Sequence, residues 1–131
     1  MGPNKDEKLS DIFGQLKRLL ASYVPPLVVR TDAKGRYEIE FDKDYEVKSE
    51  RTGRVTKKHG LYFAGIIIQS GYVGLYFMPI AARPSAFGNR SARIKGMLKG
   101  KSCLYVKGWD KELEAELETL LRDGYELFDK M

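Results

Sequence analysis

The spacing of apolar positions first predicts an amphipathic helix. In residues 6–23 the apolar side chains recur three and four positions apart, so that they form one stripe along a helix. Pro25 and Pro26 end this helix, because proline lacks an amide hydrogen and disfavours the helical conformation of the residue before it.

Strands are predicted next. Residues 27–30 and 36–41 flank a turn-rich segment, residues 32–35, and so form a β-hairpin. Residues 44–58 are mostly polar and form either a mobile loop or the extended tip of a hairpin, with a short strand near residues 45–48.

Residues 60–68 and 72–80 are the clearest strands, because they are rich in β-branched and aromatic side chains. Residues 69–71 form the turn between them. The three consecutive isoleucines at 66–68 indicate a strand that is covered on both faces or central in its sheet. We therefore expect the two strands to pair antiparallel in the middle of the sheet.

The last third of the chain predicts two helices and a strand. Residues 91–99 form a short basic helix that Gly100 ends, and residues 102–107 form a strand. Asp110 can cap a last helix with a stripe of leucines. Gly124 is expected to interrupt that helix, so that the residues after it form a turn that folds back.

This order of elements predicts the α+β class. We expect one two-layer domain over residues 1–131, with an antiparallel sheet of about five strands. N-terminal, short internal and C-terminal helices would pack on one face of the sheet and leave the other face available. A length of 131 residues fits one domain, and residues 1–5 are expected to be disordered.

Composition indicates the cellular compartment of the protein. The single cysteine fits a reducing compartment, and the charged N-terminus has no apolar core of the signal-peptide kind. Residues 61–78 are the most apolar run, but polar residues and glycines interrupt it, so no membrane helix is expected. These features indicate a cytoplasmic protein, monomeric or homodimeric.

Charge is distributed unevenly along the chain. From Arg51 to Trp109 there are eleven Lys or Arg residues and no Asp or Glu, within a net charge of +5. The candidate residues for binding an anion or a protein partner are Arg83, Arg90, Arg93, Lys95, Lys99 and Lys101, with Lys107 in the same region. Arginine binds phosphate and carboxylate well because its planar fork is bidentate.

The alternative to a specific anion site is a solvated basic surface that pairs with the acidic C-terminal helix. Specific nucleic-acid binding is not expected, because dedicated domains usually cluster basic residues more tightly, with aromatic residues between them.

Candidate metal ligands are limited to oxygen donors. One Cys and one His exclude the usual zinc sites. Glu38, Glu40 and Asp42 alternate along one strand and could hold a hard cation such as iron weakly. The alternative is a solvated outer strand face, and no cofactor is expected.

The sequence gives little support to a nucleotide-binding loop or to a catalytic cysteine. Gly100-Lys101-Ser102 resembles the end of a phosphate-binding loop, but the first glycine of that motif is missing and the segment leads into a strand. Cys103 could act as a nucleophile only with a base to lower its pKa, and His59, the single histidine, has no evident partner there. A buried, inert cysteine is the alternative.

Three segments resemble the YdhG-like family of small bacterial α+β domains, largely of unknown function: residues 61–66, 71–79 and 98–103. The match spans roughly residues 26–131. The resemblance implies an α+β fold. Some members are described as frataxin-like iron chaperones, which implies carboxylates that present a labile metal. Here the centre of the chain is wholly basic, so the resemblance supports the fold more than an iron activity.

The sequence therefore favours a non-catalytic binding module for an anionic small molecule or a protein partner. A frataxin-like iron-binding chaperone that uses Glu38, Glu40 and Asp42 is the first alternative. An enzyme that uses Cys103 is the second.

Overall fold

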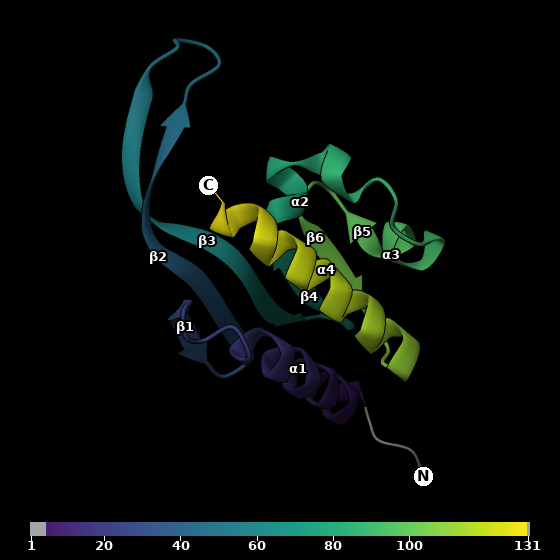
Figure 1. The fold of residues 1–131 in the computed structure, drawn as a ribbon. Coiled ribbons are helices and arrows are strands. Elements are labelled where there is room, and N and C mark those ends of the chain that lie inside the picture. Colours follow the sequence, from purple (N-terminus) through teal and green to yellow (C-terminus); the bar gives the residue numbers. More distant parts are fainter. Residues whose placement is uncertain (1–4, 131) are drawn as a thin grey trace.

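The computed structural model describes residues 5–130 (Figure 1). Its elements, in chain order, are α1 (Lys5–Ala21), β1 (Val28–Ala33), β2 (Arg36–Lys48), β3 (Val55–Gln69), β4 (Tyr72–Phe77), α2 (Met78–Ala82), η1 (Pro84–Phe87), α3 (Ala92–Met97), β5 (Leu98–Lys99), β6 (Cys103–Val106) and α4 (Lys111–Asp129). The expectation of disorder in residues 1–5 falls outside the described residues, except that Lys5 begins α1. The α+β prediction is confirmed.

The sheet has six strands in the order β1-β2-β3-β4-β6-β5, all paired antiparallel. Strands β3 and β4 are its two central strands, so the predicted central hairpin is confirmed. The prediction of about five strands was one short. Leu98 and Lys99 were expected at the end of a helix, but they pair with Leu104 and Cys103 as the edge strand β5.

Helices α1 and α4 lie on one face of the sheet (Figure 1). Arg18 of α1 forms an ion pair with Glu114 of α4, and Tyr23, in the turn after α1, lies against Tyr125 of α4 with ring centroids 5.2 Å apart. We call the opposite face the outer face. In the described part of the chain the drawn ribbon places no helix over it.

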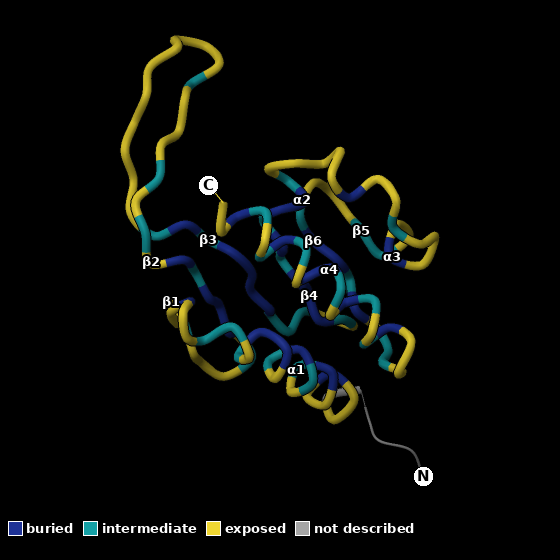
Figure 2. The backbone as a smooth tube through the Cα atoms, viewed as in Figure 1, coloured by how far each residue is buried: buried dark blue, intermediate teal, exposed yellow. Residues whose placement is uncertain are grey.

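The core lies between these helices and the sheet, where the backbone is buried in Figure 2. Phe63 and Phe77 on the central strands and Phe128 on α4 are almost completely buried. The rings of Phe63 and Phe77 meet edge to face with centroids 5.6 Å apart, a geometry that adds to the stabilisation from burial. Phe63 and Phe77 lie in the two apolar segments predicted as the clearest strands, whereas Phe128 lies in the segment that was expected to form a turn.

Strands β2 and β3 continue beyond the core as an exposed hairpin arm (Figures 1 and 2). Their pairing runs from Asp44 with His59 to Lys48 with Val55. Of the two alternatives for residues 44–58, the extended hairpin is therefore correct and the loop is confined to the tip. At the base of the arm, His59 lies between two carboxylates, with Nε2 2.7 Å from Asp42 Oδ1 and Nδ1 2.6 Å from Asp44 Oδ1.

Two boundary predictions were wrong. The strand expected to reach residue 80 ends at Phe77, because Pro79 has no amide hydrogen for a sheet and instead lies in the first turn of α2. Gly100, expected as a helix stop, has φ +74° in the turn between β5 and β6.

The prediction that Gly124 interrupts the last helix was also wrong, because α4 runs from Lys111 to Asp129 without a break. Gly124 is buried where α4 approaches β4 and α2. A Cβ at this position would lie 2.2 Å from Phe77 Cζ and 2.9 Å from Pro79 Cγ. The glycine therefore permits close packing rather than a turn.

Among residues 5–130, no helix is long and apolar enough to cross a membrane.

Candidate functional site

The predicted basic residues do not form one cluster. Arg83 follows α2, Arg90 precedes α3, Arg93 and Lys95 lie on α3, Lys99 lies on β5, and Lys101 lies in the next turn. The fold separates them into two groups. Arg90 and Arg93 bind carboxylates of the chain, whereas Arg83 and the lysines remain exposed.

Arg90 fixes the loop before α3 to the last helix. Its Nη2 lies 2.6 Å from Asp123 Oδ2, and its guanidinium lies over the Phe87 ring at 5.2 Å. Its side chain is only 19% exposed. Arg90 therefore has a structural role, as the alternative of pairing with the C-terminal helix supposed.

Arg93 pairs with the residue that begins α4. Its two terminal nitrogens lie 3.0 and 2.6 Å from the two carboxylate oxygens of Asp110. Asp110 Oδ1 also accepts a hydrogen bond of 2.8 Å from the Leu113 amide, as an N-cap. The Arg93 pair, followed by the Leu113 amide, lowers the pKa of Asp110 to about 2.

A hollow of about 270 Å³ lies beside this pair, and we call it the edge hollow. It is lined by Arg93, Gly96, Met97, Lys99, Tyr105, Lys107, Gly108 and Leu113. Lys99 and Lys107 are exposed, and within residues 7–130 neither forms an ion pair. The structure thus brings Arg93 and Lys99 of the predicted set together with Lys107, whereas Arg83, Lys95 and Lys101 do not line this hollow.

Tyr105 also lines the edge hollow, and sequence reasoning missed it. The sequence analysis placed this position only in the predicted strand of residues 102–107 and gave it no binding role. The signal that could have identified it is the alternation of tyrosines along the strands. In the structure Tyr62, Tyr72 and Tyr76 are, like Tyr105, only partly buried. The strand register puts all four side chains on the outer face.

A second hollow, the central hollow, lies on the outer face and has a volume of about 260 Å³. Its lining is Arg36, Glu38, Tyr62, Ile67, Tyr76, Met78 and Ser102. The Tyr62 ring lies over Gly65, where a Cβ would be 2.0 Å from the hydroxyl oxygen. The absent side chain of Gly65 therefore lets Tyr62 reach the carboxylate of Glu38.

Glu38 is the one buried charged residue in the described part of the chain, with 6% exposure. Its carboxylate accepts hydrogen bonds from the Tyr62 hydroxyl at 2.7 Å and from Arg36 Nε at 2.9 Å. Burial alone would raise the pKa of Glu38, but hydrogen bonds from Tyr62, Arg36 and Thr31 outweigh it and lower the pKa. Burial and then the bond to Glu38 raise the pKa of Tyr62.

Each of the three candidate metal ligands already interacts with a different side chain of the protein. Glu38 binds Tyr62 and Arg36, Glu40 lies 3.8 Å from Arg30 Nη1, and Asp42 binds His59. Over the residues that the structure describes, no three His, Cys, Asp or Glu side chains are grouped so as to hold a metal ion.

Cys103 is buried on β6, between Tyr76 and Gly74 of β4. Burial raises the pKa of its thiol, and a hydrogen bond with Tyr76 opposes this only in part. His59 is bound to Asp42 and Asp44 in the arm and is not a hydrogen-bond partner of Cys103 within residues 7–130. The arrangement supplies no base that would activate the thiol.

Comparison of the chain with protein-family models, with curated proteins and with solved structures finds no match. The resemblance to the YdhG-like family therefore stays a prediction.

Proposed function

We propose that the protein is a non-catalytic module that binds an anionic ligand in the edge hollow. The observation that carries this proposal is the pair of exposed lysines, Lys99 and Lys107, that line one hollow without a carboxylate partner in the described chain. Two cations beside one hollow repel each other, and an anion between them removes that repulsion.

Lys99 and Lys107, rather than Arg93, contact the ligand in this proposal. Arg93 already gives both terminal nitrogens to Asp110, so its bidentate face is occupied. Lys99 and Lys107 retain three donors each and no competing acceptor. Tyr105 adds an aromatic wall, which distinguishes this hollow from a scattered basic surface.

The test is calorimetric titration with pyrophosphate at low salt. Lys99→Gln and Lys107→Gln should each weaken binding by about fivefold, as expected for the loss of roughly 1 kcal/mol of exposed charge attraction. The matched control is Lys34→Gln, which removes an exposed lysine from the turn at the opposite edge of the sheet. Equal weakening by all three variants would mean that binding follows net charge alone, and the proposal would then fail.

A further inference from the structure

The antiparallel register arranges the outward side chains in rows across the sheet. Tyr76 lies beside Cys103, and Gly74 lies beside Tyr105 on the next strand. Tyr72 is the next outward position on β4 after Gly74. Two outward positions on one strand are about 7 Å apart, so these tyrosines cover a continuous area of the outer face.

Tyr72 and Tyr105 form a stacked pair on this face. Their ring centroids are 3.9 Å apart and the ring planes differ by 11°. Gly74 is the strand partner of Tyr105, and a Cβ there would be 3.7 Å from Tyr72 Cε2. Both rings keep part of their surface in solvent. The pair therefore forms an aromatic platform, and Gly74 has no side chain that would push the rings apart.

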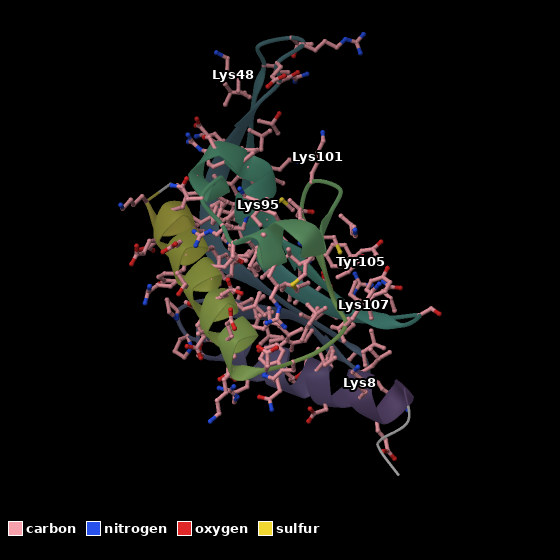
Figure 3. All side chains as sticks on the ribbon, turned by 90° about the vertical axis from the view of Figure 1, so that its right-hand side faces the viewer. Lys8, Lys48, Lys95, Lys101, Tyr105 and Lys107 are labelled. Atoms are coloured by element: carbon pink, nitrogen blue, oxygen red, sulfur yellow. The ribbon has the colours of Figure 1, made fainter. Side chains whose placement is uncertain are left out.

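Cations lie along the same edge. Figure 3 shows Lys101, Tyr105 and Lys107 on the side of the sheet away from α4. Lys99 lies beside Cys103, so its side chain also belongs to the outer face. Lys99, Lys101 and Lys107 are all exposed, and none forms an ion pair within residues 7–130.

The carboxylates of the outer face do not cancel this charge. Residues 51–109 contain no Asp or Glu. Each of the alternating carboxylates of β2 already has a partner. Glu38 is buried and bound to Tyr62 and Arg36, Glu40 pairs with Arg30, and Asp42 binds His59. The field over the tyrosines is therefore positive.

We propose that the anionic ligand of the edge hollow is a single-stranded nucleic acid, whose phosphates meet the lysines and whose bases stack on the Tyr72–Tyr105 platform. This proposal rests on the anion site proposed above and adds the class of ligand. Sheets that bind single strands combine a basic track for the backbone with aromatic rings for successive bases. A duplex keeps its bases stacked inside, so it offers no ring face to the tyrosines.

Stacking of this kind is tolerant of sequence, because every base has a π-face. The proposal thus concerns binding without base readout. The expectation against specific nucleic-acid binding depended on the order of residues along the chain, where few aromatic residues lie between the basic ones. The sheet places Tyr72 of β4 next to Tyr105 and Lys107 of the β6 segment, and thereby interleaves the two kinds of side chain in space.

The first experiment measures fluorescence anisotropy with a labelled oligothymidylate of about ten nucleotides, within the range of known site sizes. The logarithm of the association constant should fall linearly with the logarithm of the salt concentration, by about 0.7 for each phosphate neutralised. Lys99→Gln and Lys107→Gln should each reduce that slope by about 0.7. Lys34→Gln should leave both the slope and the affinity unchanged.

The aromatic contribution is tested on Tyr105. Tyr105→Leu should weaken oligothymidylate binding at least fivefold more than Tyr105→Phe, because phenylalanine keeps the ring and leucine does not. Circular dichroism confirms that each variant is folded. In the unsubstituted protein, added oligothymidylate should also shift the ring protons of Tyr72 and Tyr105 upfield, which needs no variant.

The outcomes separate the two proposals. Binding of pyrophosphate without binding of the oligonucleotide would overturn the nucleic-acid assignment and leave the anion site intact, whereas binding of neither would remove both. Equal effects of Tyr105→Leu and Tyr105→Phe, with unshifted ring protons, would mean a basic surface only and overturn the stacking. Equal competition by duplex DNA, or by a polyglutamate peptide, would also overturn the assignment, the latter in favour of an acidic protein partner.

Discussion

Arg93 and Asp110 are joined by two parallel hydrogen bonds of 3.0 and 2.6 Å, and the same carboxylate caps the first turn of α4. One acidic side chain thus orients an arginine of the edge hollow and begins the last helix. The pair links α3 to the start of α4. It also explains why Arg93, one of the predicted anion-binding arginines, is not the group left free for a ligand.

The pair predicts an acid dependence of stability. In the folded protein the pKa of Asp110 is lowered to about 2 by Arg93 and then by the Leu113 amide, whereas an unfolded Asp titrates near about 3.9. The charged form is favoured in the fold, so its stabilising contribution is present above about pH 4 and is lost as the pH falls through about 2. Carboxyl NMR titration should show the low pKa, and Arg93→Gln should raise it.

Substitutions of Asp110 distinguish its role as the N-cap of α4 from its ion pair with Arg93. At pH 7, Asp110→Ala should lower the thermal midpoint by a few degrees, because it removes the cap and the ion pair together. Asp110→Asn should lower it less, since asparagine is also a good N-cap. Thermal unfolding followed by circular dichroism measures both. Identical midpoints for the two variants would contradict a capping role.

His59, at the base of the hairpin arm, should titrate at a higher pH than an ordinary histidine. Hydrogen bonds to Asp44 and then to Asp42 raise the pKa of His59 above its usual value of about 6.5. The protonated form is favoured in the fold, so its contribution is fully present below about pH 6.5 and is lost as the pH rises through the folded-state pKa. NMR titration of the imidazole is the measurement.

Variants of the two carboxylates provide the control for the His59 titration. Asp44→Asn and Asp42→Asn should each move the pKa of His59 toward about 6.5, with the larger change for Asp44. An unsubstituted protein in which His59 already titrates near that value would show that the two carboxylates do not hold the ring in solution.

Two glycines in helices should respond to alanine in opposite directions. Gly124→Ala should destabilise the protein by about 1–3 kcal/mol, because the added Cβ overlaps Phe77 and Pro79 in a packed core. Gly14→Ala should stabilise it by up to about 1 kcal/mol, because Gly14 lies exposed on α1 with nothing within 4 Å of the added atom. Chemical denaturation measures both, and stabilisation by Gly124→Ala would show that α4 does not approach β4 this closely.

The thiol of Cys103 should react slowly in the folded protein. It is 9% exposed, and burial raises its pKa, so little thiolate forms near pH 7. A disulfide reagent should label it much faster after denaturation. A folded-state rate equal to or above the denatured rate would revive Cys103 as a nucleophile.

Ferrous iron should bind no more tightly than the micromolar range. Glu38, Glu40 and Asp42 are already held by Tyr62, Arg30 and His59 respectively, so they do not converge as a hard cation requires. Anaerobic calorimetry is the measurement. Submicromolar affinity that disappears in a Glu38→Gln, Glu40→Gln, Asp42→Asn variant would make the iron chaperone the better proposal.

Much of the fold was determined by local pattern. The apolar stripe of residues 6–23 formed α1, and the β-branched segments around Ile66 and Leu75 formed the central strands. These assignments succeeded because periodicity and proline act over a few neighbouring residues. The boundaries failed where contacts with another element decided them, as at Gly124, whose role depends on Phe77, and at Leu98, whose strand depends on Leu104.

The candidate site was determined by the sequence only in part. The residue types and the absence of carboxylates between residues 51 and 109 identified a basic region, and both are visible in the sequence without a structure. Which cations remain free was decided by the tertiary structure, because Asp123 and Asp110 of the C-terminal segment bind Arg90 and Arg93. The stacking of Tyr72 on Tyr105 likewise depends on the pairing of β4 with β6. Contacts between residues in different elements leave no periodic signal in the chain, and they appear only when the sheet and helices pack.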